Sequence, residues 1–359
     1  MRILQYYPRA IAGDGGMTTA VRQLARSLDR AGAQASIAFD AASGRAPDVP
    51  GINWLPIRHH GPRNQRIPDA RSFAGAVRGS DVIVLNSGFA PHNVVAARAA
   101  RKQHIPYVVA PRGAYDPHIF LRRPRTKRIW WRRFEYPMVE RARAVHLFFA
   151  DDAANLEQLG YHGRTLVAPN GVEPPPDMEW DGGTAGSLLW LGRFDPQHKG
   201  LDLLVSAVAR VPSDRRPSLR LVGPDWRDGR ERTVALIREL DVADWVSVEP
   251  AIHGAEKWSA LKSATGFVYP SRWEGFGNSV AEAASLGLPV LVTPYPLGCL
   301  LHRSGGAVMA PATVEGLSEG LQSLAGAASI GARARQIMRD EMSWDHIGRS
   351  WLAQAEALI

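Results

Sequence analysis

Short apolar runs alternate with amphipathic segments along the first half of the chain. Apolar runs of strand length occur at residues 3–7, 35–40, 81–85, 107–110 and 144–149. Segments with apolar positions on one face predict helices at about 18–30, 91–103 and 127–142. Residues 43–70 are rich in Pro, Gly and His, and we predict a loop there.

The same alternation resumes in the second half, after a segment rich in Pro and Gly. Strands are predicted at 187–191, 219–222, 245–248, 266–269 and 290–293, with helices at about 201–210, 229–240, 255–263 and 280–286. Strands separated by helix-length segments indicate parallel sheets built from βαβ units. We therefore predict an α/β protein with two tandem, Rossmann-like, doubly wound domains that face each other across a cleft.

Length and composition agree with two globular domains. The chain has 359 residues, of which 45% are hydrophobic and 22% charged, so wholesale disorder is excluded. No apolar run approaches the ~18 residues of a membrane span, and no signal-peptide pattern opens the chain. A single cysteine, Cys299, excludes an internal disulfide. We expect a cytoplasmic protein.

Positive charge is concentrated in the first half. Residues 1–180 hold 25 of the 43 Lys and Arg but 15 of the 35 Asp and Glu, which leaves 18 and 20 for the remainder. Seven cations and no acid lie between Arg122 and Arg133, next to Trp130 and Trp131. This segment is either a solvated helix face or a surface for an anionic membrane or acceptor. No nucleic-acid-binding motif accompanies it, so we expect no nucleic-acid partner.

Loops that follow predicted strands carry the candidate chemistry, because open α/β sheets bind ligands at the carboxyl ends of their strands. The first loop, residues 13–17, places Gly15 and Gly16 at a helix N-terminus that favours an anion. It matches no dinucleotide or P-loop motif, and a plain tight turn is the alternative. The second loop carries Arg193 and Lys199, which suit a diphosphate but are also ordinary surface cations.

The third loop, residues 269–282, runs from a strand through glycines into a helix. Backbone amides of residues 276–280 would point at a phosphate, and Glu274 would reach neutral hydroxyls beside it. Glu282 has two interpretations. It is either a ligand contact or the acidic member of a capping box that begins at Ser279.

The third loop resembles the E-x7-E signature of retaining glycosyltransferases of the GT-B fold, family 4 (group 1), with Glu274 and Glu282 as the two acids. Four further segments resemble family motifs in the expected order: Gly15-Gly16, Pro169-Asn170-Gly171-Val172-Glu173, Gly192-Arg193 with Lys199-Gly200, and Ser343-Trp344. The resemblance implies an acceptor-binding domain over residues 1–172 and a linker over 173–186. It further implies a domain for the nucleotide sugar over 187–342 and a helix over 343–359 that crosses back to the first domain.

The resemblance also implies residue roles. Arg193 and Lys199 would neutralise the departing diphosphate, Glu274 would bind hydroxyls of the donor sugar, and Glu282 would bind the ribose. The other implied donor contacts are backbone or small side-chain positions: Gly15, Gly16, Phe276, Gly277, Asn278 and Ser279. The resemblance implies no metal and no other cofactor, because the nucleotide-diphosphate sugar is a substrate.

The chain departs from the family pattern at two places. Many relatives carry a histidine where this chain has Arg112, so Arg112 becomes a candidate contact for an anionic acceptor, with His118 and His92 as neighbouring candidates. After the strand that ends near residue 248, the chain reads Glu249-Pro250-Ala251 rather than the usual glycine.

The function implied is transfer of a sugar from a nucleotide-diphosphate sugar to a saccharide or lipid-linked acceptor, with retention of configuration. Synthesis of a cell-surface polysaccharide at the inner face of the membrane would suit the basic, Trp-containing segment. Two alternatives stay open: a sugar-nucleotide epimerase of the same fold, and a non-catalytic partner that binds a nucleotide sugar within an enzyme complex.

Overall fold

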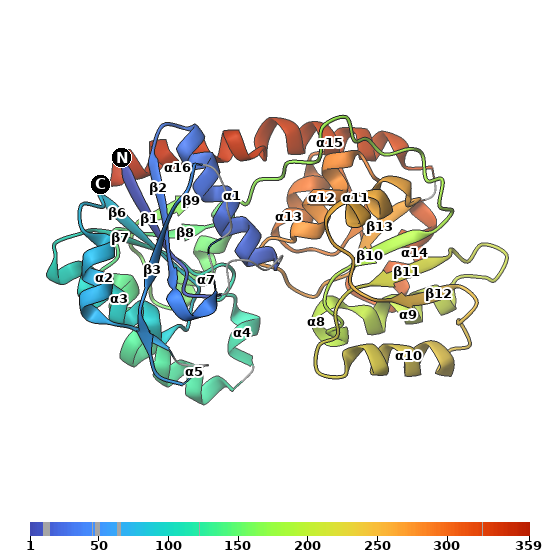
Figure 1. The fold of residues 1–359 in the computed structure, drawn as a ribbon. Helices are drawn as coiled ribbons and strands as arrows, with labels where there is room; N and C mark the ends of the chain where they lie inside the picture. Colours follow the sequence, from blue (N-terminus) through green and yellow to red (C-terminus); the bar gives the residue numbers. More distant parts are fainter. Residues whose placement is uncertain (10–14, 45, 47–50, 63–65, 122, 325) are drawn as a thin grey trace. The chain divides into compact units, whose positions relative to one another are not determined.

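The computed structural model divides the chain into two compact units, each built on a parallel sheet (Figure 1). The first unit comprises Met1–Gly171 and Trp344–Ile359, and the second comprises Val172–Ser343. The structure describes residues 1–9, 15–44, 46, 51–62, 66–121, 123–324 and 326–359. The prediction of two α/β domains with parallel sheets is confirmed.

The first unit has a seven-stranded sheet in the order β3-β2-β1-β6-β7-β8-β9. Its strands are β1 (Arg2–Tyr6), β2 (Gln34–Asp40), β3 (Asn53–Ile57), β6 (Val82–Asn86), β7 (Tyr107–Ala110), β8 (Ala144–Leu147) and β9 (Thr165–Val167). Its main helices are α1 (Gly16–Arg30), α2 (Ala70–Val77), α3 (Pro91–Lys102), α4 (Pro117–Leu121), α5 (Pro124–Trp130), α6 (Tyr136–Glu140), α7 (Ala153–Gln158) and α16 (Trp344–Leu358). A two-stranded antiparallel ribbon joins β4 (His59–His60) to β5 (Ile67–Pro68).

Helices cover both faces of this sheet, so its central strands are apolar at every position. In β6, Val82 and Val84 pack into one core, and Ile83 and Leu85 pack into the other. All four side chains are fully buried, as expected for a parallel strand between two helical layers. This burial explains why the sequence pattern located β6 without alternation of polar residues.

The C-terminal helix α16 packs on α1 within the first unit. Trp351 is fully buried, and Gly348 lies where a Cβ would collide with the Ser27 carbonyl oxygen. Arg30 donates from Nε to Asp345 across 2.5 Å at the edge of the contact. The close approach of the two backbones therefore depends on the glycine.

Three local predictions for the first unit need correction. Residues 43–70 are not only loop, because β3 lies there and pairs with β2 in parallel. The helix predicted from residue 127 begins at Pro124, and a π-helical turn at Trp131–Glu135 joins α5 to α6. Strand β9 was not predicted and pairs with β8.

The second unit has a six-stranded parallel sheet in the order β12-β11-β10-β13-β14-β15. Its strands are β10 (Leu188–Leu191), β11 (Leu219–Val222), β12 (Val246–Glu249), β13 (Gly266–Tyr269), β14 (Val290–Val292) and β15 (Val308–Met309). Its helices are α8 (Pro196–Lys199), α9 (Leu201–Arg210), α10 (Gly229–Glu239), α11 (Gly254–Ser263), α12 (Asn278–Leu286), α13 (Pro296–Arg303), α14 (Val314–Ser323) and α15 (Ala328–Glu341).

Residues 173–186 lie within the second unit and are tied to it by hydrogen bonds. Trp180 donates from its backbone amide to Leu286 O (3.0 Å) and from its indole to Ala264 O (2.8 Å). Ala185 N donates to Ser263 O at 2.8 Å, so this segment is held along α11 and α12 rather than extended in solvent.

Candidate functional site

The strand order of the second unit reverses between β10 and β13, and the loops that follow these strands lie against each other. Arg272 N donates to His198 O at 3.0 Å, which joins the two loops through their backbones. Gly200 has φ +67°, and a Cβ there would collide with the Pro270 carbonyl oxygen. In open α/β sheets, this reversal at the carboxyl ends is the usual ligand site.

At this place the structure brings Lys199 and Glu274 into direct contact. Lys199 ends α8, and its Nζ forms an ion pair with Glu274 Oε1. Ser271 Oγ donates to the same carboxylate oxygen at 2.7 Å, and Lys199 Nζ lies 5.2 Å from the centroid of the Tyr269 ring. The two charged side chains are only 9% and 10% exposed, so water screens the pair weakly.

In this pair the pKa of Glu274 lies below its ordinary value and the pKa of Lys199 lies above its ordinary value. Burial alone would raise the pKa of Glu274, but Lys199 and then His198 hold it below its ordinary value. Burial would lower the pKa of Lys199, but Tyr269 and Glu274 raise it above its ordinary value. Both groups are therefore charged at neutral pH, and the site holds one fixed cation and one fixed anion side by side.

His198 stacks on Trp273 and holds the loop that carries Glu274. The two rings are 4.2 Å apart and nearly parallel, and the His198 ring lies with Nε2 2.9 Å from Trp273 O. Burial is the main cause that lowers the pKa of His198, with the Lys199 charge second. Sequence reasoning missed His198, Ser271 and Tyr269, although each of the first two lies within three residues of a predicted site residue.

Arg193, also predicted for the diphosphate, lies apart from the ion pair. It is exposed on the loop after β10, and its Cζ lies 4.6 Å from the centroid of the Trp226 ring. Trp226 follows β11, so Arg193 is held from the neighbouring strand and not by Glu274. Trp226 was not a predicted site residue.

The start of α12 differs from one interpretation of the sequence. Gly277, with φ +94°, is the N-cap residue, so Ser279 lies inside the helix and the proposed capping box is wrong. Glu282 instead accepts a bond from Lys257 Nζ of α11 at 2.6 Å through its Oε1. Phe276 and Gly277 are buried, and Asn278 and Ser279 form the first turn of α12.

In the first unit, Arg112 lies beyond the carboxyl end of β7. Its Nε and Nη2 donate to Asn86 Oδ1 at 3.0 and 2.9 Å, and its guanidinium lies over Phe148. Burial lowers the pKa of Arg112 to about 10. The backbone of Arg112 is left-handed (φ 56°), as are those of Ser87 (85°) and Phe89 (53°) after β6. Non-glycine residues in this conformation carry strain that is common at functional sites.

The remaining candidates of the first unit occupy different environments. His92 lies in the first turn of α3, after Pro91, and burial, followed by the charge of Arg9, lowers its pKa to about 4. His118 is more exposed, and its Nδ1 pairs with Asp116 Oδ1 at 2.9 Å. Gly15 precedes α1 and Gly16 begins it. The predicted loop residues Gly13 and Asp14 lie outside the described residues.

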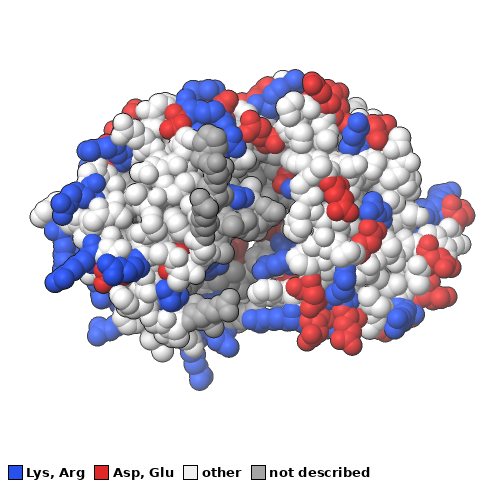
Figure 2. All heavy atoms as spheres, in the orientation of Figure 1, with Lys and Arg blue, Asp and Glu red and all other residues white. Residues whose placement is uncertain are grey.

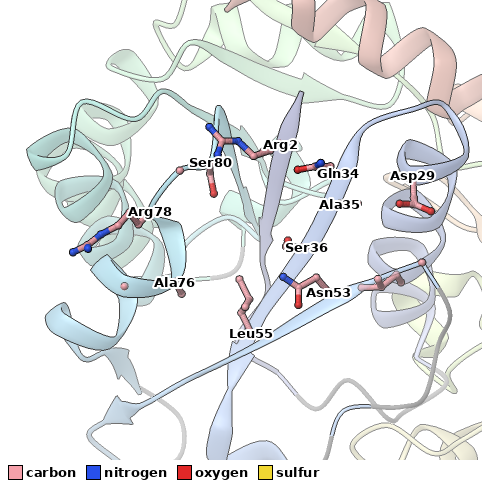
Figure 3. Close-up of a pocket in the computed structure, with 14 residues that line it drawn as sticks. Arg2, Asp29, Gln34, Ala35, Ser36, Asn53, Leu55, Ala76, Arg78 and Ser80 are labelled. Carbon is pink, nitrogen blue, oxygen red and sulfur yellow. The ribbon is translucent and has the colours of Figure 1, made fainter.

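A cavity of about 700 Å³ lies at the amino ends of strands of the first sheet, on the side away from the predicted loops (Figure 3). It is lined by Arg2, Gln34 and Asn53, which start or lie near the amino ends of β1, β2 and β3. The predicted loops follow the carboxyl ends of strands, so this cavity contributes nothing to the candidate site.

The basic segment of the first unit is strongly exposed. Lys and Arg side chains lie along the left and lower margin of this unit in the view of Figure 2, with few acids among them. Leu121 and Ile129 are 76% and 67% exposed on α4 and α5 among these cations. Arg122 lies outside the described residues. No helix in the described part of the chain is long and apolar enough to cross a membrane.

Comparison with known sequences defines the class of protein. A profile described as "Glycosyl transferase 4-like domain" matches residues 15–171, and one described as "Glycosyl transferases group 1" matches residues 185–326. The two matches fall on the two units and together span most of the chain. The chain belongs to the group 1 glycosyltransferases of family 4.

The similarity to individual proteins is distant, and for some of them it extends over most of the chain. The chain is 27% identical over 327 residues to a GDP-mannose:cellobiosyl-diphosphopolyprenol alpha-mannosyltransferase of Xanthomonas campestris, covering 86% of this chain and 82% of the relative. A sucrose-phosphate synthase from Thermosynechococcus elongatus superimposes with a TM-score of 0.80 at 21% identity, over 100% and 99% of the two chains. Anabaena HepE, solved with UDP-glucose, gives 0.78 at 19% identity over 99% and 100%. These similarities establish the GT-B fold.

Proposed function

We propose that this glycosyltransferase moves a sugar from a nucleotide-diphosphate sugar to a saccharide or lipid-linked acceptor, with retained configuration and without a metal. The observation that carries the proposal is the buried Lys199–Glu274 pair at the strand-order reversal of the second unit. The pair offers an ammonium for a phosphate beside a carboxylate for sugar hydroxyls. The relative in Xanthomonas campestris, whose name states a lipid-linked acceptor, supports the acceptor class.

The chemistry follows from where charge develops. As the bond from the anomeric carbon to the diphosphate breaks, negative charge grows on the departing phosphate. Lys199, Arg193 and the backbone amides at the start of α12 would stabilise this charge more than that of the intact donor, and such selective stabilisation lowers the barrier. Loss of one preorganised donor of this kind costs about 10²–10³ in turnover.

Glu274 and Glu282 would bind neutral hydroxyls on either side of the diphosphate. Lys199 and Ser271 both contact Glu274 through its Oε1. We propose that Oε2 of Glu274 accepts hydrogen bonds from the sugar hydroxyls. Lys257 likewise contacts Glu282 through its Oε1, and we propose that Oε2 of Glu282 accepts hydrogen bonds from the ribose hydroxyls. In both cases one oxygen fixes the carboxylate and the other binds, because a carboxylate can accept several hydrogen bonds.

The first unit would receive the acceptor. Arg112, with a desolvated guanidinium held by Asn86, suits an anionic group on that acceptor. The amides of Gly15 and Gly16 at the start of α1 would meet the donor diphosphate. The basic face with exposed Leu121 and Ile129 would rest on an anionic membrane, which would place the enzyme peripherally at the inner face, where lipid-linked saccharides are extended.

The first experiment is a donor screen with the full chain. GDP-mannose is the first donor to test because the Xanthomonas relative is named for it, followed by UDP-glucose. Acceptor-dependent release of the nucleoside diphosphate, undiminished by EDTA, with an α-linked product from an α-linked donor by NMR, supports the proposal. Donor conversion without an acceptor indicates an epimerase, and binding without release indicates a non-catalytic partner. Either result refutes it.

The membrane contact has its own test. Reversing the charge of Arg123, Arg132 and Arg133 should reduce co-sedimentation with phosphatidylglycerol vesicles, and phosphatidylcholine vesicles should bind little of either form. Reversal of three exposed arginines of the second unit, Arg215, Arg232 and Arg238, is the control and should leave sedimentation unchanged. Equal losses in both variants would show that only net charge matters and would remove the specific surface.

A further inference from the structure

The turn that follows β11 packs directly on the loop that carries Arg193. Glycines at both ends of this turn make the approach possible. A Cβ on Gly223 would collide with the Gly192 carbonyl oxygen, and a Cβ on Gly229 would collide with the Phe194 carbonyl oxygen. Phe194 also forms an isolated β-bridge with Asp225, in the middle of the turn. The two loops are therefore fixed to each other by their backbones.

This turn holds Trp226 in a defined position. The two residues after it, Arg227 and Asp228, are both left-handed, with φ 54° and 59°. The Asp225 carboxylate accepts bonds from Asp228 N (3.2 Å) and Arg230 N (2.8 Å), which closes the turn. Two consecutive strained residues persist only where the surroundings determine the conformation, and here the Asp225 bonds and the packing on the Arg193 loop do so.

The indole of Trp226 is the surface on which Arg193 lies. The distance from Arg193 Cζ to the ring centroid is 4.6 Å. Among the described residues, Arg193 forms no ion pair and its guanidinium donates no hydrogen bond. Stacking on a ring face leaves the planar edge of a guanidinium, with its five N–H groups, free to bind a phosphate.

A second stack in the same unit shows the contrasting arrangement. Arg216 Cζ lies 4.5 Å from the centroid of Trp245, almost the same distance. There, however, the guanidinium donates from Nε to Val211 O (3.1 Å) and from Nη2 to Ala209 O (2.8 Å). The Arg216 stack thus supports the local fold, whereas the Arg193 stack keeps its donors uncommitted.

We propose that Trp226 is a positioning residue for the donor diphosphate: it holds Arg193 by cation–π stacking, so that an edge of the guanidinium is available to donate to the phosphate. The inference rests on the proposed function, because it assumes that Arg193 binds the diphosphate. Arg has a long, flexible side chain, and a guanidinium already placed on the indole loses less rotamer freedom when the diphosphate binds.

The test measures nucleotide binding by calorimetry with the full chain, using GDP and GMP, or UDP and UMP if these bind instead. Trp226→Leu removes the ring face but keeps an apolar side chain, and it should weaken diphosphate binding about two- to five-fold while leaving monophosphate binding unchanged. Trp226→Phe, which restores a ring face, should recover most of the loss. Trp245→Leu is the matched control and should change neither affinity.

A double-mutant cycle tests whether Trp226 influences diphosphate binding through Arg193. In the Arg193→Ala background, Trp226→Leu should cause no further loss of diphosphate affinity, because the residue acts through Arg193. Additive losses, or an equal loss for the monophosphate, would overturn the inference and leave the proposed function intact. If Arg193→Ala itself leaves the preference for diphosphate over monophosphate unchanged, the diphosphate role of Arg193 fails, and the inference fails with it.

Discussion

The buried Lys199–Glu274 pair allows a sharp test of the electrostatics of the second unit. We consider Lys199→Met, which keeps the volume and removes the charge, and the double variant that adds Glu274→Gln. In the single variant the Glu274 carboxylate stays buried, with Ser271 Oγ as a donor but without its cation. In the double variant both charges are gone, because a neutral amide replaces the carboxylate and no unpaired ion stays buried.

The magnitude follows from the exposure of the pair. Because both side chains are about one-tenth exposed, removal of one partner leaves a poorly solvated charge, which costs about 3–5 kcal/mol. For a unit of this size, ~1 kcal/mol shifts the melting temperature by about 2–4 °C, so Lys199→Met should lower it by about 6–20 °C. The double variant should regain most of this loss, since replacement of both buried charges is often nearly neutral.

The pH dependence should change sign. In the wild-type chain the pKa of Glu274 is below its ordinary value of 4.5, so its contribution to stability is present above pH 4.5 and is lost as pH falls through the folded pKa. Without Lys199, burial raises the pKa of Glu274 above 4.5, and protonation then favours the folded state. Stability of Lys199→Met should therefore fall as pH rises from 4.5 through the raised pKa.

Thermal unfolding between pH 4 and pH 8 measures both effects without a substrate. Lys257→Met, which breaks the Lys257–Glu282 pair, is the control. Its partners are 26% and 21% exposed, so the loss should be smaller. A Lys199→Met loss no larger than the control, with an unchanged pH slope, would refute the argument that water is excluded from Lys199 and Glu274. Wild-type turnover in the same variant would separately remove Lys199 from the proposed chemistry.

Three further predictions address other parts of the chain. Burial, with the Arg112 charge second, lowers the pKa of His146 from 6.5 to about 3. The contribution of His146 to stability is therefore present above pH 6.5 and is lost on acidification. Between pH 7.5 and pH 5, the free energy of unfolding of His146→Gln should fall by about 2 kcal/mol less than that of the wild-type chain, as measured by urea titration. Gly223→Ala forces a Cβ against the Gly192 carbonyl oxygen and should lower the melting temperature. Gly75→Ala, in an open helical position, should instead raise the free energy of unfolding by about 0.5–1 kcal/mol. Equal effects of the two substitutions on the melting temperature would contradict the packing described. Glu282→Gln should raise KM for the donor and reduce the preference for GDP over its 2′,3′-dideoxy analogue in competition assays; an unchanged preference would exclude Glu282 from the ribose contact.

The sequence predicts strands well where both faces of a sheet are covered and poorly at the sheet edge. Val82 to Leu85 are all buried, so they appear in the sequence as a continuous apolar run. Strand β3 contains Pro56 and is partly exposed at the edge of the sheet, where proline is tolerated, and its composition therefore suggests a loop. Strand β9 has only three residues, too few for a periodic pattern.

The candidate site was predictable as a set of residues but not as a set of contacts. Motif spacing pointed to Arg193, Lys199 and Glu274, yet Lys199 and Glu274 are 75 residues apart in sequence. Their contact depends on the order of strands in the sheet, because β13 lies next to β10 although β11 and β12 come between them in the chain. The same reason hides the stack of Arg193 on Trp226, since nothing in the local sequence of either residue specifies the other.

Several strained backbone positions lie in the turns that follow the carboxyl ends of strands, where ligands are expected. Among the described residues, nine non-glycine residues have positive φ, and five of them follow β6, β7 or β11: Ser87, Phe89, Arg112, Arg227 and Asp228. Each costs on the order of 1–3 kcal/mol, and the other four lie in turns elsewhere in the chain. In both units the strained turns hold an arginine whose N–H groups face few protein acceptors: Arg112 on Asn86 and Arg193 on Trp226. In each unit the strained backbone therefore lies beside an arginine that we propose binds an anion.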